Sequence, residues 1–164
     1  MWWLIIGLCT GGLLFTGDSF QNEAQYVKNR TTGGQIVSEG WLQKGKKERY
    51  WKFYTSSGVV EREGHYRKDK REDYWFFYYP DGQKKMEGRF VNNRMNGLWM
   101  YYNAKGKLIK QCDYHKSRAD GYCVLYEEGE MVKAERFEKG EKTGEWTSYL
   151  KFMADNPQWL RKKG

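Results

Sequence analysis

Hydrophobic and polar residues alternate over short stretches of this chain from residue 34 onward, and turn-forming residues interrupt the alternation at regular intervals. The glycines Gly34, Gly58, Gly82 and Gly106 lie 24 residues apart, and Gly129 follows after 23. Alternation over a few residues is typical of half-buried β-strands, and a period of this length is typical of repeat architectures. The pattern predicts five repeat units, which span residues 34–57, 58–81, 82–105, 106–128 and 129–152.

The units share side chains at fixed distances from their opening glycine, which we number position 0. Position 11 holds a turn former: Gly45, Asp69, Asn93, Ser117 and Gly140. Position 17 holds Trp51, Trp75, Trp99, Cys123 and Trp146. Position 20 is always tyrosine: Tyr54, Tyr78, Tyr102, Tyr126 and Tyr149. Position 6 holds Gly40, Gly64 and Gly88, then Cys112. Because a residue at position 11 can accept a positive φ, each unit is predicted to fold as one β-hairpin.

Folding each hairpin about position 11 predicts that position 6 pairs with position 17, and position 8 with position 15. We therefore expect an all-β fold, an elongated antiparallel meander that forms one twisted single-layer sheet. Alternation places the tryptophans on a mainly apolar face, together with the position-2 residues Ile36, Val60, Leu108 and Met131. The tyrosines of position 20 fall on the other, more polar face. Packing between repeats explains both aromatic sets, and the tyrosines are the better candidates for binding.

The unit G-x5-G-x-(aromatic)-x8-W-x2-Y resembles the bacterial variant of the MORN repeat found in YwqK-type antitoxin proteins. The fuller motif, with glycine two residues before the tryptophan, occurs twice: Gly97-Trp99-Tyr102 and Gly144-Trp146-Tyr149. Arg49 and Asp73 replace that glycine in the first two units. The resemblance covers residues 34–152 and implies a β array used for protein contact, with toxin neutralisation and membrane recognition among the family's roles. It assigns no functional residue, because the matching positions are structural.

The two ends of the chain differ from the repeats. Residues 1–17 carry no charged side chain and resemble the apolar part of a secretory signal, which favours an exported or envelope-associated protein. An uncleaved anchor and a segment packed on the fold are the alternatives. Residues 18–33 are interpreted as a linker. Residues 153–164 are interpreted as a basic cap or tail, in which Pro157 opens a short helix.

The formal net charge is +8, which would attract an acidic protein, an anionic membrane or nucleic acid. Basic residues surround the first two hairpin turns: Lys44, Lys46, Lys47, Arg49, Arg67, Lys68, Lys70 and Arg71. Since these turns recur along one edge, we expect the charges to gather there. The plain alternative is that they protect the sheet from edge-to-edge aggregation. A protein partner is favoured, a membrane surface is second, and nucleic acid is disfavoured.

The sequence contains no motif of a catalytic, metal or cofactor site. His65 and His115 occupy different repeat positions, away from any Cys/His cluster with zinc spacing. An open single-layer sheet also offers little enclosure for shifting the pKa values of catalytic carboxylates. We expect a non-enzymatic protein that needs no cofactor and binds a protein partner through its sheet. The alternative is an envelope or membrane-surface protein held by its N-terminal segment and basic edge.

Cys112 and Cys123 replace the glycine and tryptophan of the fourth unit together. Because positions 6 and 17 are expected to face each other, we predict a disulfide across this hairpin. The alternative is two buried thiols that fill the space of glycine plus tryptophan.

Overall fold

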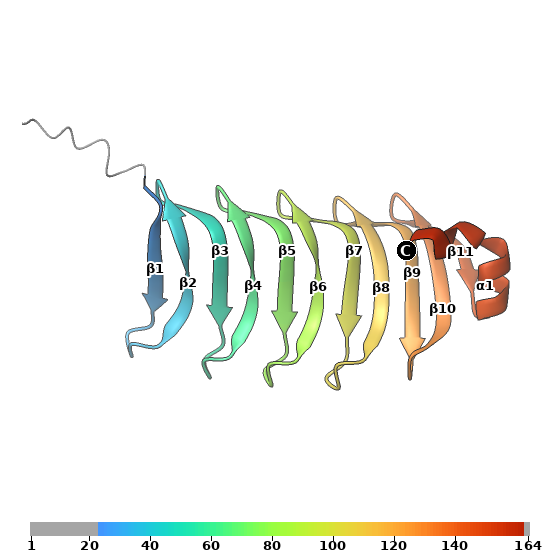
Figure 1. Cartoon of the computed structure of the whole chain (residues 1–164), viewed down its shortest axis with the longest axis horizontal. Helices are drawn as coiled ribbons and strands as arrows, with labels where there is room; N and C mark the ends of the chain where they lie inside the picture. Colours follow the sequence, from blue (N-terminus) through green and yellow to red (C-terminus); the bar gives the residue numbers. More distant parts are fainter. Residues whose placement is uncertain (1–22, 163–164) are drawn as a thin grey trace, which may run out of the picture.

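The computed structural model describes residues 23–162, and the N-terminal segment 1–17 lies outside the described residues. Eleven strands form one open sheet in which each strand pairs antiparallel with the next along the chain (Figure 1). The strands are β1 (Gln25–Arg30), β2 (Ile36–Gln43), β3 (Lys46–Tyr54), β4 (Val60–Arg67), β5 (Lys70–Tyr78), β6 (Lys84–Val91), β7 (Arg94–Tyr102), β8 (Leu108–His115), β9 (Arg118–Glu127), β10 (Glu130–Glu138) and β11 (Glu141–Trp146). The helix α1 (Tyr149–Asp155) and the 3-10 helix η1 (Pro157–Lys162) follow. The predicted all-β meander is confirmed.

The interpretation of residues 18–33 as a linker is wrong for residues 25–30, which form β1. Val27 pairs with Gly40, so it stands where a tryptophan stands in the later repeats. β1 thus takes the place that the second strand of a repeat has in the later units. It supplies the backbone partners that β2 would otherwise lack on its outer side.

The turn of each hairpin has the geometry that the sequence predicts. In the β4–β5 turn, Lys68 and Asp69 have φ values of 51° and 64°, and the other tight turns repeat this pair of positive φ values. Two successive positive φ values define the type I′ turn, whose twist matches that of the strands it joins. These five tight turns lie along one edge of the sheet, the upper edge in Figure 1.

The predicted pairing holds at position 6 and fails beyond it. Gly40 pairs with Trp51, but Trp41 pairs with Glu48, so Arg49 and Tyr50 are left out of the β2–β3 ladder as a β-bulge. Leu42 consequently pairs with Lys47 at position 13. In the third unit the glycine of the fuller motif, Gly97, is the bulge residue and has a positive φ of 75°. Arg49 adopts the same conformation in the first unit without being glycine (φ 58°).

The face prediction for position 2 is wrong. Val60 pairs with Tyr54, and Arg62 pairs with Phe53, so Glu61 is an extra residue in β4. A shift of one residue moves a side chain to the other face of the sheet. Ile36, Val60, Leu108 and Met131 therefore lie on the same face as the tyrosines.

The tryptophans form the core of their face. Trp51, Trp75 and Trp99 are at most 1% exposed. Each indole lies over the glycine of its own hairpin, where a Cβ atom would come within 2.3–2.4 Å of a ring atom. Each indole nitrogen also donates to a backbone carbonyl, as Trp75 does to His65 at 3.0 Å. The glycine at position 6 therefore provides the space that the tryptophan occupies.

The last hairpin departs from the repeat at both predicted aromatic positions. Only Thr143 is left out of its ladder, so Trp146 pairs with Ala134, and it is Glu145 that pairs with Glu135. The missing bulge residue turns Trp146 to the tyrosine face. Tyr149 is not in a strand at all: it opens α1, whose N-cap is Ser148, and it is 49% exposed. Pro157 does begin a short helix, which is η1.

The structure joins Cys112 and Cys123 in a disulfide between β8 and β9, with their Cα atoms 4.0 Å apart. Their side chains are at most 2% exposed. They occupy the row in which the preceding hairpins place glycine and tryptophan. The bond therefore takes the place of a glycine–tryptophan contact.

Breaking this bond is expected to lower the free energy of unfolding by roughly 2–3 kcal/mol, since it closes a short loop in the unfolded chain. Denaturant unfolding of oxidised and reduced protein would measure the difference, with a Cys112→Ala/Cys123→Ala variant as the reference. Thiol titration of denatured, unreduced protein taken from its native compartment should find both thiols blocked. Full reactivity of Cys112 and Cys123 would contradict the prediction.

Candidate binding surfaces

The face that carries the tyrosines, which we call the tyrosine face, has one continuous row of side chains across all eleven strands. This central row is Lys28, Glu39, Lys52, Glu63, Phe76, Glu87, Met100, Gln111, Val124, Ala134 and Trp146. Its chemistry changes along the sheet, from alternating charges at β1–β4 to apolar side chains at β9–β11. Directly opposed residues interact across strands, so this face is electrostatic at one end and hydrophobic at the other.

At the charged end, each carboxylate of the central row accepts a hydrogen bond from the tyrosine of its own repeat. The hydroxyl of Tyr54 donates to Glu39 at 2.5 Å, and that of Tyr78 donates to Glu63 at 2.6 Å. The bond from Tyr54 lowers the pKa of Glu39 against the opposing effect of burial, and Lys28 adds to the lowering. Burial, followed by the hydrogen bond to the glutamate, raises the pKa of Tyr54 and of Tyr78. These tyrosines are thus held neutral and oriented by carboxylates, which sequence analysis did not single out.

A lysine accompanies every carboxylate of the row. Lys28 lies 3.3 Å from Glu39, Lys52 lies 3.5 Å from Glu63, and Lys84 lies 2.9 Å from Glu87. The fourth repeat has Leu108 where Lys84 stands, and it has the neutral Gln111 where Glu87 stands. Tyr126, the tyrosine of that repeat, has a buried hydroxyl without a hydrogen-bond partner among the described residues. The fourth repeat therefore lacks both members of the ion pair that Lys84 and Glu87 form in the third.

Gln111→Glu is expected to destabilise the protein by about 1–3 kcal/mol, because Gln111 is 7% exposed and an unpaired carboxylate there would be desolvated. Adding Leu108→Lys should recover most of that loss by supplying the cation. Urea unfolding of the two variants, with Leu108→Lys alone as the control, measures the effect. Equal stability of Gln111→Glu with and without the lysine would show that the pairing is incidental.

At the apolar end, α1 covers the tyrosine face. Phe152 of α1 is fully buried against Tyr122, Val124 and Ala134. The Tyr122 hydroxyl donates to Asn156 Oδ1 at 2.6 Å, and the Trp146 indole nitrogen donates to Asp155 Oδ2 at 2.9 Å. The C-terminal helix is therefore seated by one aromatic anchor and two polar contacts.

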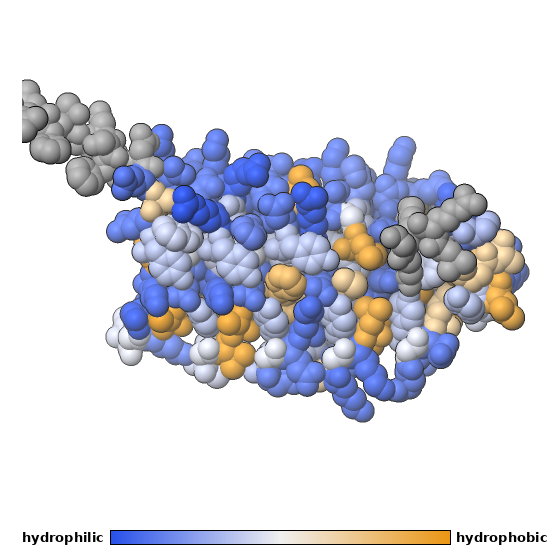
Figure 2. All heavy atoms as spheres, in the orientation of Figure 1, coloured by the Kyte–Doolittle hydropathy of each residue, from blue (hydrophilic) through white to orange (hydrophobic). Residues whose placement is uncertain are grey.

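Between the charged end and α1, the tyrosine face is open. Tyr74 is 42% exposed and Leu98 is 44% exposed, while Phe76 and Met100 of the central row are half-buried. Figure 2 shows this face: pale and orange side chains run along its middle, and mostly blue side chains line the edge formed by the tight turns. The open part is thus an area where apolar side chains of the sheet are left uncovered.

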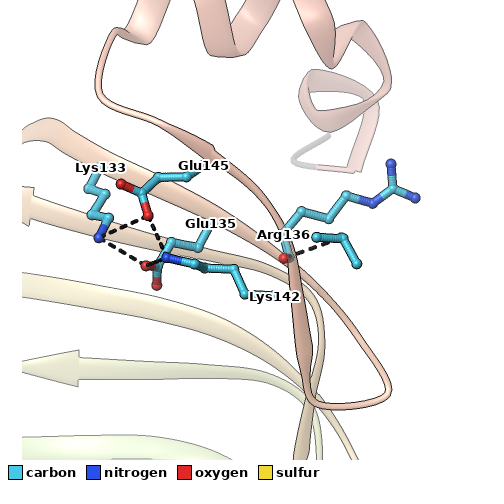
Figure 3. A network of polar contacts seen from close by, with 6 residues as sticks. Lys133, Glu135, Arg136, Lys142 and Glu145 are labelled. Carbon is cyan, nitrogen blue, oxygen red and sulfur yellow. Dashed lines mark hydrogen bonds and ion pairs between the residues drawn. The ribbon is translucent and has the colours of Figure 1, made fainter.

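The opposite face, which we call the tryptophan face, is sealed by cations. Arg71 lies over Phe90 with its guanidinium carbon 4.0 Å from the ring centroid, and Arg62 lies over Phe53 at 4.3 Å. At its C-terminal end, Lys142 Nζ lies 2.6 Å from Glu145 and Lys133 Nζ lies 3.0 Å from Glu135 (Figure 3). The charged side chains of this face are engaged by aromatic rings and carboxylates of the same face, so it is the weaker candidate for binding.

The predicted basic edge is present in part. Five of its residues lie exposed in the first two tight turns: Lys44, Lys46, Arg67, Lys68 and Lys70. The prediction also put three residues at the edge that instead lie over aromatic rings: Lys47 over Trp51, Arg49 over Trp41, and Arg71 over Phe90. Their positions within the strands and the bulge direct them inward over the sheet, where cation–π contacts hold them.

The structure extends this edge beyond the first two repeats. Exposed cations occupy the next three tight turns as well: Arg94, Lys116, Arg118 and Lys139. All four of these side chains, together with His115 and Asp120, line a hollow of about 620 Å³. We use the name basic edge for the five tight turns with these cations. The sequence contained the signal, since a lysine precedes the turn former in four of the five units.

Carboxylates at this edge are engaged by backbone groups. Asp69 accepts from the amide of Lys47 at 2.8 Å, and Asp120 accepts from the amide of Lys139 at 3.1 Å. Glu48 likewise accepts from the amide of Lys68. These bonds tie each turn to the neighbouring repeat. The carboxylates thus serve the turns, while the turn lysines Lys44, Lys68, Lys116 and Lys139 are exposed.

These features define the class of the protein, an open repeat-built all-β meander. Comparison of the sequence with protein-family models and with curated proteins gives no match. Within residues 23–162, no helix has the length and apolar character that a membrane crossing requires. In the same part of the chain, no three His, Cys, Asp or Glu side chains converge as metal ligands would.

The solved structures that the chain matches include two that are similar to it only at a low level. One is the GtfA/B complex bound to UDP and GlcNAc, with a TM-score of 0.42 and 12% identity over 70% of this chain and 26% of that one. The other is the structure of accessory secretory proteins 1, 2 and 3 of Streptococcus pneumoniae, with a TM-score of 0.37 and 12% identity over 84% of this chain and 24% of that one. The chain thus spans about a quarter of the length of these proteins.

Proposed function

We propose that this chain is a non-catalytic binding protein that takes an acidic protein partner along its basic edge. The resemblance to the MORN-type repeat supports an antitoxin-like use, in which the sheet covers a surface of the partner. Export is part of the proposal, because a disulfide between Cys112 and Cys123 persists in an oxidising compartment.

The observation that carries the proposal is a lysine held in the left-handed conformation at four of the five tight turns. Lys44, Lys68, Lys116 and Lys139 have φ values between 50° and 53°. Type I′ turns favour asparagine, aspartate or glycine at this position, and the third turn does use Asn92. A residue kept in an unfavourable conformation at repeated sites points to a role other than stability. Here the repeated feature is a positive charge facing solvent.

Replacing these lysines is expected to weaken binding while strengthening the fold. Lys68→Asn/Lys116→Asn should stabilise the protein by about 0.5–1 kcal/mol per site, since asparagine tolerates the left-handed region. The same variant should bind a fluorescein-labelled dodecaglutamate peptide at least about fivefold more weakly, with a shallower dependence on salt. Lys85→Asn/Lys105→Asn removes the same charge away from the basic edge and is the matched control.

The same measurement separates the partner classes. Fluorescence anisotropy with an oligothymidylate of equal length, and flotation with phosphatidylglycerol vesicles, test nucleic acid and membrane. Binding to vesicles without binding to the peptide would replace this proposal with the membrane-surface alternative. Equal losses for the edge variant and its control would contradict a role for the basic edge.

A further inference from the structure

The helix α1 shows what the tyrosine face accepts. Phe152 enters between Tyr122 and Val124 of β9 and Ala134 of β10, with its ring 5.6 Å from that of Tyr122. Contact with the helix leaves Tyr122 9% exposed and Val124 fully buried. The face therefore has a demonstrated occupant at its C-terminal end, a short helix with an aromatic anchor.

Tyr122 and Val124 have counterparts in the earlier repeats, toward β5, and α1 does not cover those counterparts. Tyr122 is preceded one repeat earlier by Leu98 and two repeats earlier by Tyr74, which are 44% and 42% exposed. In the central row Val124 is preceded by Gln111, Met100, Glu87 and Phe76, and the two polar members, Gln111 and Glu87, are buried. Each of β5–β8 has a paired strand on both sides. A ligand here must engage side chains, because no strand edge is available for it to pair with.

We infer that the open part of the tyrosine face, formed by Tyr74, Phe76, Leu98 and Met100, docks an amphipathic helix of a protein partner beside α1. The inference rests on the proposed function for the existence of a protein partner, but it concerns a separate surface. The helix presents a phenylalanine or leucine to this patch, as α1 presents Phe152. Strands about 4.8 Å apart make the β5–β8 face roughly 15–20 Å wide. A helix of about 10–14 residues spans it at 1.5 Å per residue.

Each of the two cations that border the patch is paired with a carboxylate: Arg89 lies 3.1 Å from Asp73, and Lys84 lies 2.9 Å from Glu87. Arg89 pairs with Tyr74 of β5 and with Asn96 of β7, and its side chain is 60% exposed. Lys84 borders Phe76, with its ammonium 5.2 Å from the ring centroid and its side chain 39% exposed. The basic edge adjoins the same side of the sheet (Figure 2). Glutamates of the helix would compete with Asp73 and Glu87 for these cations, so we expect the apolar stripe to carry the binding.

The test uses two synthetic 14-residue peptides of one composition, a phenylalanine, three leucines, five glutamates and alanines. In the first peptide the apolar residues form one helical stripe, and in the second they are scrambled around the helix. Anisotropy titration of the full chain should show the striped peptide binding at least about tenfold more tightly. Leu98→Ser and Tyr74→Ser should each weaken that binding at least about fivefold. Ile109→Ser, which alters a similarly exposed apolar residue of a bulge, should change it less than twofold.

The outcomes separate this inference from the proposed function. If both peptides bind equally, and only Lys68→Asn/Lys116→Asn weakens them, the edge binds acidic chains and the helix site is overturned. If the chain dimerises in sedimentation velocity and Leu98→Ser restores the monomer, a second copy occupies the face and the inference also fails. If neither these peptides nor dodecaglutamate binds, the proposed function itself fails. Circular dichroism of each serine variant verifies that the sheet is intact.

Discussion

Trp75→Ala is expected to lower the free energy of unfolding by roughly 3–5 kcal/mol, the largest loss that we predict for any single substitution. The indole is fully buried and lies in van der Waals range of Phe77 and Phe90, whose centroids are both 6.0 Å from its own. It also belongs to the middle of a repeat array, in which each unit is stabilised only by its neighbours. A cavity at this site weakens the interfaces on both sides.

Trp146→Ala is the control for this prediction. Trp146 is half-buried at the end of the sheet and contacts Phe152 of α1, so its loss should loosen the C-terminal helix and cost less. Guanidinium unfolding followed by far-ultraviolet circular dichroism measures both variants. Equal losses at the two sites would show that the array does not behave as a chain of nearest-neighbour units.

Gly64→Ala is expected to cost about 3 kcal/mol although it adds a single methyl group. The new Cβ would lie 2.4 Å from Cδ2 of Trp75 and 2.5 Å from Cγ, in the middle of the indole, where the ring cannot rotate away. Overpacking of this kind displaces the backbone or forces the ring off its rotamer. Gly33→Ala is the matched control, because its nearest atom is 3.8 Å away, and it should be close to neutral.

A double-mutant cycle tests the cause directly. In the Trp75→Ala background, Gly64→Ala should cost nothing, or should stabilise by about 0.5 kcal/mol because alanine is less flexible than glycine. The difference between the two backgrounds is the coupling energy of the glycine and the indole. Independent effects of the two substitutions would mean that Gly64 is required for some reason other than space for Trp75.

The sequence alone determined the repeat, the hairpin of each unit and the opposition of Gly64 to Trp75. These features depend on residues at fixed spacings within one unit, and tight turns impose local requirements that particular residue types reveal. The pair of Cys112 and Cys123 belongs to the same group, because its positions within the hairpin could be counted. The cations of the first two turns were also visible as a group along one edge.

The tertiary structure decided which face each side chain occupies. Two bulges in every complete repeat shift the alternation by amounts that spacing does not reveal, and a change of one residue reverses the face. Because of these shifts, Val60 lies on the tyrosine face and Trp146 faces α1. The open apolar patch around Leu98 is a consequence of the same ladders, since its residues come from strands of two different repeats. Only the assembled sheet places the charged row, the uncovered patch and the helix side by side on one face. They follow one another across the strands, and so they are far apart in the sequence.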